Sequence, residues 1–336
     1  MTSIERLRRR LTGEPVDRIP NFNIFMGRAA HHINETLRGY YLDHRVLCRA
    51  NFAVLEDFEL DIVQAISDPY RETADFGADI IFPDDGLPVC RAPLIVEEGD
   101  LMRLSPLQPE KGARMSDRIE AVRLFREKAG GEVPIMGWVE GAMAEAADLR
   151  GVNQLLLDLY DRPEWLEELL ELCVETEIAF ARAQVAAGAD IIGLGDAIAS
   201  QVGPERYRRF ALPYEKRIFD EVKGAGALAR LHICGDTTAL LEDMVGSGAD
   251  IIDIDWMVDI GSAAKVFNGR TALCGNQDPA AVMLAGTPEI VRRAVRTCAE
   301  KGGPFFISAA GCEIPDGTPA VNLRAQSEVL RELADS

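Results

Sequence analysis

A five-residue phrase that recurs three times constrains the fold of this chain more than any other feature. Gly-Ala-Asp-Ile-Ile occupies residues 77–81, 188–192 and 248–252, each time after a helix-like stretch and before an acidic residue. Glycine suits the position just after a helix, and the apolar run suits a strand that is buried on both faces. The phrase therefore indicates the turn from a helix into a strand of a parallel sheet. Its irregular spacing argues against a solenoid.

Further apolar runs have the same character and bring the predicted strands to eight. They lie at residues 19–25, 133–141, 229–236, 271–279 and 304–311. Helical patterns separate them, such as residues 163–187, which begin at Pro163, and a helix with Thr287 as N-cap and Pro288 in its first turn. Eight strands that alternate with helices predict an α/β fold, the (β/α)₈ TIM barrel.

The rest of the chain fits around that barrel. A short basic helix before Pro15 and a mostly helical stretch over residues 28–63 form an N-terminal helical extension, and residues 87–102 read as a hairpin excursion. No linker or low-complexity tract interrupts the sequence, so we expect a single barrel domain over residues 1–336.

Polar residues gather at the ends of the predicted strands. In a TIM barrel the chemistry lies at the carboxyl ends of the strands, and here each run starts apolar and ends polar. The residues at those ends are Asp84, Asp85, Glu140, Asp196, His232, Cys234, Asp253, Asp255, Asn276, Asp278 and Cys312. Packing alone does not explain this asymmetry, which predicts one site at the barrel mouth.

Among these residues, His232, Cys234 and Cys312 point most specifically to one kind of site. Side chains alternate along a strand, so His232 and Cys234 point the same way while Ile233 points into packing. A second thiol from another strand gives three soft ligands, the number that catalytic zinc uses while keeping its fourth position open. The plain alternative is that all three are packed core residues, because free cysteine is usually buried.

Composition narrows the classes of partner. The net charge is −19 and the isoelectric point is about 4.7, which argues against nucleic acid and against an anionic membrane surface. Seven scattered cysteines suggest reduced thiols rather than a disulfide framework. The N-terminal residues lack the apolar core of a signal peptide and no apolar stretch is long enough to span a membrane, so we expect a cytoplasmic protein.

The ligand types suggest the chemistry of the metal. Two thiolates and an imidazole suit zinc, and an electron-rich zinc thiolate is a good nucleophile towards an alkyl group. A Cys₂His zinc site also serves alcohol dehydrogenases, but no strand is followed by the G-x-G-x-x-G of a dinucleotide site. A zinc hydrolase would need a general base near the metal, and Glu140 is the best candidate for it.

Four segments carry a family resemblance. They are HICGDTT (232–238), GADIIDID (248–255), CGNQDPAAVMLAGTPEIV (274–291) and AAGCEIPDGTPAVNL (309–323). With them the chain resembles the uroporphyrinogen decarboxylase superfamily, and within it the cobamide-dependent methyltransferases that act on thiols such as coenzyme M. The resemblance covers nearly the whole chain. It implies a (β/α)₈ barrel, zinc ligands at His232, Cys234 and Cys312, and methyl transfer to or from a cobamide.

The chain departs from the decarboxylases of that superfamily. Their arginine-rich segment, which grips the carboxylates of the porphyrinogen, corresponds here to NFNIFMGRAA with Arg28 alone. Cys312 stands where they use histidine. The run IIFPDD does resemble the strand that ends in their catalytic aspartate, which falls on Asp84. A decarboxylase-like barrel with another activity stays an alternative, as does a barrel that only binds a small molecule.

The other candidate residues have open roles. Glu140 lies where the resemblance implies an uncharged residue in thiol methylases, so it is a candidate fourth ligand, a proton acceptor or a solvated carboxylate. Asp196 orients His232, binds a polar substrate group or caps the following helix. Asn276 is a candidate cofactor-binding residue, although Asn276 and Asp278 also suit the turn before Pro279.

The expected partners follow from the same resemblance. The chain has no D-x-H-x-x-G corrinoid signature, since Asp43-His44 has the wrong spacing. A methylcobamide or other corrinoid would therefore arrive on a separate corrinoid protein that docks transiently. The small molecule is either a methyl donor, such as a methoxylated compound that is demethylated, or a thiol acceptor.

Overall fold

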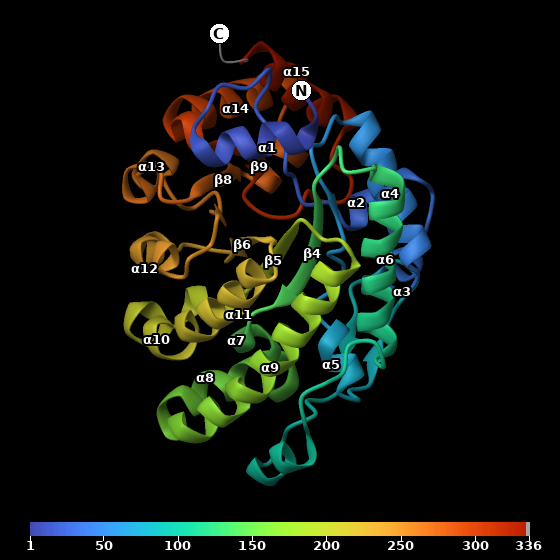
Figure 1. Ribbon diagram of the computed structural model, residues 1–336, viewed down its shortest axis with the longest axis vertical. Helices are drawn as coiled ribbons and strands as arrows, with labels where there is room; N and C mark the ends of the chain where they lie inside the picture. Colours follow the sequence, from blue (N-terminus) through green and yellow to red (C-terminus); the bar gives the residue numbers. More distant parts are fainter. Residues whose placement is uncertain (334–336) are drawn as a thin grey trace.

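A curled parallel sheet forms the centre of the molecule (Figure 1). The computed structural model describes residues 1–333. Seven strands pair in the order β1-β4-β5-β6-β7-β8-β9. Their bounds are β1 Val63–Gln64, β4 Ile135–Glu140, β5 Ile191–Gly195, β6 Leu228–His232, β7 Ile251–Asp253, β8 Ala272–Gln277 and β9 Phe306–Ala310.

The segment around Asn21 closes this sheet into a barrel. Asn21 forms a parallel bridge with Ser308 of β9, and the Asp61 amide, just before β1, donates to the Asn21 carbonyl at 2.9 Å. The predicted strand at residues 19–25 thus takes the eighth strand position and links the two edge strands, β1 and β9. The predicted TIM-barrel class is confirmed.

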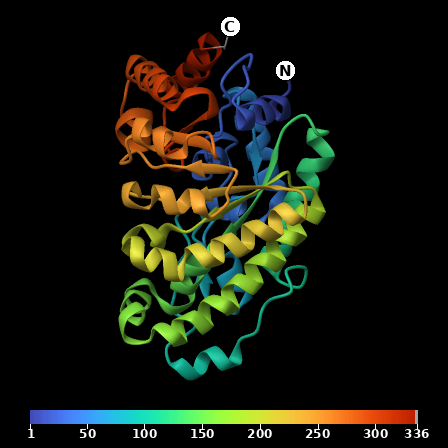
Figure 2. The same cartoon turned by 60° about the vertical axis from the view of Figure 1, so that its left-hand side comes forward.

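Helices surround the barrel on its outer face (Figure 2). The α-helices are α1 Ser3–Thr12, α2 Gly27–His32, α3 Leu37–Leu42, α4 His44–Asp57, α5 Arg71–Asp75, α6 Ala113–Ala129, α7 Ala142–Arg150, α8 Val152–Asp161, α9 Pro163–Ala187, α10 Gly203–Phe210, α11 Leu212–Gly224, α12 Leu241–Gly246, α13 Ile260–Phe267, α14 Pro288–Gly302 and α15 Ala320–Glu332. Shorter turns are the 3₁₀ helices η1 Glu98–Arg103, η2 Ala197–Gln201, η3 Thr238–Leu240 and η5 Gly303–Phe305, and the π-helix η4 Pro279–Leu284. Within residues 1–333 no helix is long and apolar enough to cross a membrane.

The predicted helix boundaries at Pro163 and Thr287 are confirmed. The helix α9 begins at Pro163 and ends at Ala187, and the next residue, Gly188, has a φ of 113°, the left-handed conformation that glycine permits. In α14 the Thr287 side chain accepts a hydrogen bond from the Ile290 amide, and Pro288 is the first helical residue. These helix boundaries could be predicted correctly because capping depends only on residues that are neighbours in the sequence.

One predicted strand was wrong. The first Gly-Ala-Asp-Ile-Ile phrase leads into β2 (Ile80–Ile81), which pairs antiparallel with β3 (Val89–Cys90) in a separate two-stranded sheet. The barrel position expected for it belongs to β1, inside the stretch expected to be helical. Both β1 residues are fully buried, whereas Ile81 is 41% exposed. The phrase at residues 77–81 therefore has the sequence pattern of a barrel strand without the burial of one.

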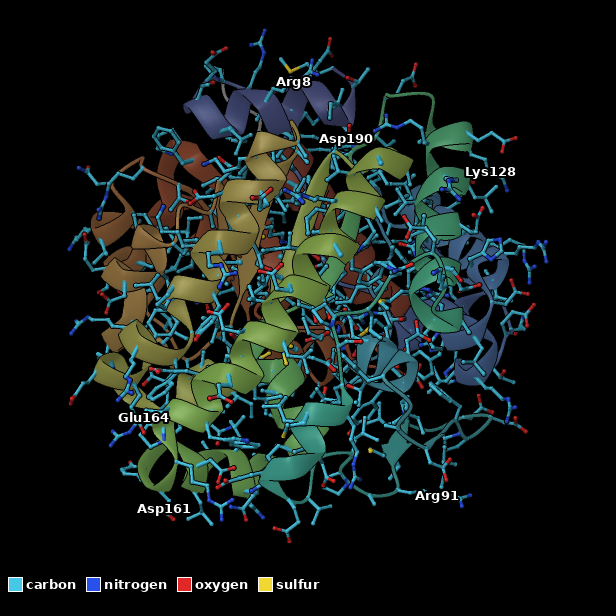
Figure 3. All side chains as sticks on the ribbon, turned by 60° about the horizontal axis from the view of Figure 1, so that its bottom comes forward. Arg8, Arg91, Lys128, Asp161, Glu164 and Asp190 are labelled. Carbon is cyan, nitrogen blue, oxygen red and sulfur yellow. The ribbon has the colours of Figure 1, made fainter. Side chains whose placement is uncertain are left out.

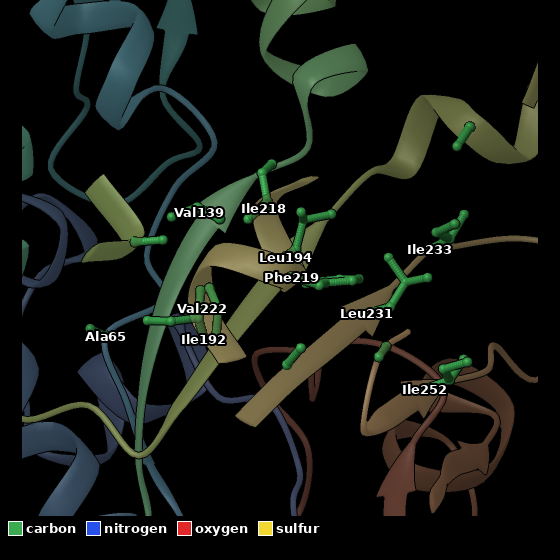
Figure 4. Packing of buried hydrophobic residues seen from close by; sticks show 14 of the residues in the cluster. Ala65, Val139, Ile192, Leu194, Ile218, Phe219, Val222, Leu231, Ile233 and Ile252 are labelled. Carbon is green, nitrogen blue, oxygen red and sulfur yellow. The ribbon is translucent and has the colours of Figure 1, made fainter. Parts of the chain in front are cut away.

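Side chains alternate between two cores. Ile192 and Leu194 of β5, Leu231 of β6 and Ile252 of β7 face outward and pack with α11 residues such as Phe219 (Figure 4). The alternate residues face the barrel interior, among them Met136, Ile191, Ile251, Cys274 and Ile307. This period of two is what a strand packed on both faces requires.

The helix α1 closes the amino-terminal end of the barrel. Leu7 is fully buried among the interior residues, and the Ile4 amide donates to the Glu132 carbonyl at 3.0 Å, just before β4. Arg8 of the same helix projects away from the barrel, as Figure 3 shows. With this end covered, the carboxyl ends of the strands at the opposite mouth are left for chemistry.

Candidate metal centre

Two strands bring His232, Cys234 and Cys312 together. His232 ends β6, Cys234 follows it by two residues, and Cys312 follows β9. The His232 Nε2 lies 3.1 Å from the Cys234 Sγ, the two sulfurs are 3.5 Å apart, and the Cys312 Sγ is 3.7 Å from the His232 Nε2. Ile233, between the first two, is fully buried in the outer core, as strand alternation predicts.

These distances match the edges of a zinc tetrahedron. Zinc–sulfur bonds of about 2.3 Å and zinc–nitrogen bonds of about 2.0–2.1 Å place tetrahedral ligand atoms roughly 3.5–3.8 Å from one another. The two separations that involve the Cys312 sulfur lie in that range, the His232–Cys234 separation is shorter, and all three side chains can offer a ligand atom to one ion. The donor set therefore fits a zinc ion with three protein ligands and one further position.

The arrangement favours a negative charge on one of the two thiols, Cys312. The pKa of the Cys312 thiol falls to about 4 because Cys234 donates a hydrogen bond to it and His232 lies beside it, which together outweigh burial. The pKa of Cys234 rises, first because of its hydrogen bond to Cys312 and then because of burial. One thiolate at neutral pH is thus inherent in the arrangement, and a thiolate is the form that binds metal.

Asp253 orients the histidine, a role that the sequence did not reveal. Its Oδ2 lies 3.1 Å from the His232 Nδ1, so Nε2 is left to face the thiols. Arg230, on the same barrel-facing side of β6, donates from Nε to the Asp253 Oδ1 at 2.9 Å. Burial raises the pKa of Asp253, but Arg230 and His232 outweigh it and bring this pKa down to about 2. Carboxylate support of this kind fixes the orientation of a metal-binding histidine.

Removing this support is expected to weaken metal binding. The variant Asp253→Asn keeps the shape but loses the charge that holds His232, so the affinity for zinc should fall about 10–100-fold. Titration against a competing chelator measures the change. Asp250→Asn is the control, because Asp250 holds the Ala229 amide and Lys223 at the other end of the same strands. Equal zinc affinity in Asp253→Asn and the wild type would contradict the role.

A cavity of about 210 Å³ opens beside the three ligands. Apolar side chains form much of its wall, including Met26, Ile66 and Trp138. The Trp138 ring lies 6.2 Å from the His232 ring, centre to centre. Gly193 makes room for it, because a Cβ there would lie 2.3 Å from the indole. The barrel mouth therefore offers a small, partly apolar chamber next to the candidate metal position.

Glu140 ends β4 and lines the same cavity, where it pairs with Arg71. The Arg71 Nη2 donates to the Glu140 Oε1 at 2.6 Å, and both side chains are buried. Burial raises the pKa of Glu140 to about 7, with Arg71 opposing and Glu72 adding to the rise. The carboxyl group is not solvated, and near neutral pH it can hold or release a proton.

Asp255 is a second carboxyl group at the mouth whose position the sequence left without a role. Its Oδ2 accepts from the Gly235 amide at 2.8 Å, one residue beyond Cys234. A Cβ on Gly311, next to Cys312, would lie 2.7 Å from the Asp255 Oδ1. Burial raises the pKa of Asp255, and the charges of Cys312 and His232 also act on it. Asp255 therefore lies against the segments that carry both thiols.

The remaining predicted residues lie away from the three ligands. Asp196 is fully buried and faces the start of α7, not His232. Burial raises the pKa of Asp196 well above its usual range, and the amides of Ala144 and Met143 oppose the rise. Asn276 donates to the carbonyls of Asp255 and Val258, at 3.0 and 2.7 Å, and holds a loop. Asp278 caps η4 at Ala280 and Ala281, as expected for a turn.

Asp84 follows the misassigned strand. It lies exposed in the turn after β2 and does not line the cavity beside His232. Its neighbour Asp85 contacts the His31 Nε2 at 3.1 Å. The barrel-mouth position expected for Asp84 rested on the strand that the structure replaces with β1.

Comparisons with known proteins show which family and fold the chain shares. The family model for uroporphyrinogen decarboxylase (URO-D) matches residues 2–333. A methylcobamide:CoM methyltransferase, MtbA of Methanosarcina acetivorans, is 31% identical over 338 residues, which cover 98% of each chain. A uroporphyrinogen decarboxylase of Nocardia farcinica is 30% identical over 304 residues, 87% of this chain and 84% of the other. A solved structure of a methyltransferase from Methanosarcina mazei covers 99% of both chains with a TM-score of 0.90 at 24% identity.

Proposed function

The chain belongs to the uroporphyrinogen decarboxylase family, and within that family we propose that it is a zinc-dependent methyltransferase working with a corrinoid protein. The observation that carries the proposal is the His232, Cys234 and Cys312 triad at the floor of a small cavity. The similarity to methylcobamide:CoM methyltransferases over 98% of the chain supports methyl transfer as the reaction. We take residues 1–336 as one barrel domain in the cytoplasm, consistent with seven free cysteines.

The three ligands would hold zinc through one nitrogen and two sulfurs. When bound there, zinc lowers the pKa of a thiol and keeps it as a nucleophilic thiolate. Asp253 keeps the His232 Nε2 directed at the site, and Arg230 keeps Asp253 ionised. Asp255 lies beside the segments that carry the thiols, and Glu140 lines the cavity. Either carboxyl group is a candidate for the fourth metal position or for accepting a proton.

Glu140 is our choice for moving the proton. Its carboxyl group lines the cavity with a pKa of about 7, which is near the value that suits a general acid or base at neutral pH. Arg71 holds one oxygen of Glu140 and so fixes the direction of the group. A thiol that enters the cavity must lose one proton when its sulfur is methylated, and the Glu140 carboxylate can accept it.

The size of the cavity separates the two substrates. At about 210 Å³ it is smaller than the roughly 300–1,000 Å³ typical of pockets for drug-sized ligands. A small methyl donor or acceptor fits, whereas a corrinoid ring does not enter. The corrinoid therefore stays on its own protein, which brings the ring to the barrel mouth during a transient encounter.

Transfer from the corrinoid to a thiol is the direction that the donor set favours. The reverse direction, demethylation of a methylated small molecule, is the second candidate. It is favoured by the Glu140–Arg71 pair, because a protonated carboxyl group can donate to a leaving oxygen or nitrogen. Porphyrinogen decarboxylation is disfavoured, because Arg71 is the only arginine or lysine among residues 1–333 that lines the cavity, and it already pairs with Glu140.

Two measurements test the proposal together. Elemental analysis of the purified protein should give about one zinc per chain, as three ligands around one position imply. Zinc-loaded protein with methylcobalamin and a small thiol should yield the S-methyl product by mass spectrometry, and chelator-treated protein should not. Zinc-free protein that is fully active, or zinc-loaded protein that only decarboxylates uroporphyrinogen, would refute it.

A further inference from the structure

The cavity beside the metal position is lined by more acidic than basic groups. Carboxyl groups of Glu140, Asp68 and Glu313 line it, against the single guanidinium of Arg71. His232 also lines it, but as a zinc ligand the imidazole is neutral. A small molecule that carries a negative charge would therefore enter a chamber with an excess of negative charge around it.

Arg71 offers little to such an anion, because its side chain is buried and its charge is already balanced by carboxylates around it. It is 1% exposed, and its Nη1 donates to the Asp68 carbonyl while its Nη2 donates to Glu140. Its Nε lies 3.4 Å from the Glu72 Oε2. An entering sulfonate or carboxylate would compete for Arg71 with the Glu140 carboxylate, which already holds a buried charged hydrogen bond, among the stronger contacts a side chain makes.

The other two carboxyl groups are also held in place. Asp68 pairs with Arg114, and Glu313 accepts from the Gly27 amide at 3.0 Å. Among the three carboxyl groups that line the cavity, Glu140 is therefore the one that is hydrogen-bonded to Arg71. The indole of Trp138, which precedes it by two residues on β4 and lines the same wall, offers a ring face of the kind that attracts cations.

Resting on the proposed function, we infer that Glu140 sets the charge class of the small substrate: neutral or cationic molecules, such as an amine-bearing thiol or a methylated amine, are accepted, and anionic thiols such as coenzyme M are rejected. This inferred charge preference differs from that of the methylcobamide:CoM methyltransferases, whose name gives the anionic coenzyme M as their substrate. Glu140 does this by occupying Arg71 and by adding its own charge.

Three thiols that share a two-carbon chain and differ in the charge of the terminal group test the inference. They are 2-mercaptoethylamine, 2-mercaptoethanol and 2-mercaptoethanesulfonate, which is coenzyme M. Calorimetric titration into zinc-loaded full-length protein at about pH 8, where Glu140 is largely ionised, should rank their affinities in that order. We expect coenzyme M to bind at least about tenfold more weakly than the amine, since one unfavourable charge contact in a buried site readily costs that much.

The variant Glu140→Gln should reverse the order. It removes the charge and frees the Arg71 Nη2, so coenzyme M should gain about tenfold in affinity while the amine loses a similar factor. The acidities of the three thiols are the same in both proteins, so the change in ratio isolates the side chain. Glu313→Gln is the matched control, because it also removes a lining carboxylate but leaves Arg71 occupied; it should lower the amine preference without any gain for coenzyme M.

A conservative variant, Glu140→Asp, tests whether the effects of Glu140→Gln come from the lost charge or from a damaged site. Glu140→Asp retains the charge and should retain the preference for the amine, with zinc content measured in every variant. Tightest binding of coenzyme M by the wild type, or an unchanged order in Glu140→Gln with full zinc content, would overturn the inference while leaving the methyl transfer proposal standing. Failure of all three thiols to bind zinc-loaded wild-type protein would overturn both.

Discussion

Replacing Cys312 with serine is expected to abolish zinc binding and methyl transfer together. The variant removes one of three ligands, and the serine hydroxyl is a far weaker zinc donor than a thiolate whose pKa is about 4. Loss of a supporting contact behind a ligand already costs about 10–100-fold in metal affinity, so loss of the ligand itself should cost more than about 100-fold. Zinc content should fall from about one per chain towards zero.

Elemental analysis after gel filtration measures the loss, and unfolding curves show whether the barrel persists. Cys90→Ser is the control, because Cys90 lies in β3 of the small outer sheet and donates only to the Ala92 carbonyl. Cys90→Ser should keep both zinc and activity. Full zinc content in Cys312→Ser would mean that the ion is held elsewhere, and would remove the basis of the proposed chemistry.

The part of the fold that could be predicted is the part in which local pattern and burial agree. The phrases before Ile191 and Ile251 lead into barrel strands, and Gly188 and Gly248 take the left-handed conformation that such turns need. The same phrase before Ile80 leads into an outer hairpin, because a strand's partner is chosen by tertiary burial that the pattern does not encode. The barrel strand β1 has only two residues, too few for any periodicity to reveal.

The site shows the same division. His232, Ile233 and Cys234 alternate as a strand must, so the facing of the two ligands follows from their spacing. The Asp253 contact depends on register, because β7 pairs with β6 so that Asp253 lies opposite His232. That register is set between strands far apart in sequence. Arg71 is harder still, since it comes from α5, in a crossover whose strand was placed wrongly. The two-residue spacing of Arg230 and His232 puts both side chains on the same face of β6. An arginine on that interior face is a signal that a buried carboxylate, here Asp253, lies nearby.

Buried carboxyl groups beyond the metal position make the stability of the barrel depend on pH. Glu215 of α11 is fully buried and accepts from the Tyr207 hydroxyl at 2.6 Å, while its Oε1 has no hydrogen-bond partner among the described residues. Burial raises the pKa of Glu215 from 4.5 to about 7, although the hydrogen bond from Tyr207 opposes the rise. Glu140 and Glu313 are shifted in the same direction.

The sign of the effect follows from that shift. A carboxyl group whose pKa is higher in the folded state stabilises the fold below its unfolded pKa, and this contribution is lost as the pH rises through the folded value. From 4.5 to about 7, Glu215 alone accounts for roughly 3 kcal/mol of unfolding free energy that disappears between about pH 4.5 and pH 8. The wild type should therefore be less stable at about pH 8 than at about pH 5.

The variant Glu215→Gln isolates this contribution. Glutamine keeps an oxygen for the Tyr207 hydroxyl but carries no charge, so the variant should be more stable than the wild type at about pH 8 by up to roughly 3 kcal/mol and nearly equal to it at about pH 5. Urea unfolding at both pH values measures the difference. Asp220→Asn, at an exposed position of the same helix, is the control. If Glu215→Gln lost as much stability between the two pH values as the wild type does, Glu215 would not be the source of the pH dependence. The buried acidic residues around α5, α7 and α9 would then account for it.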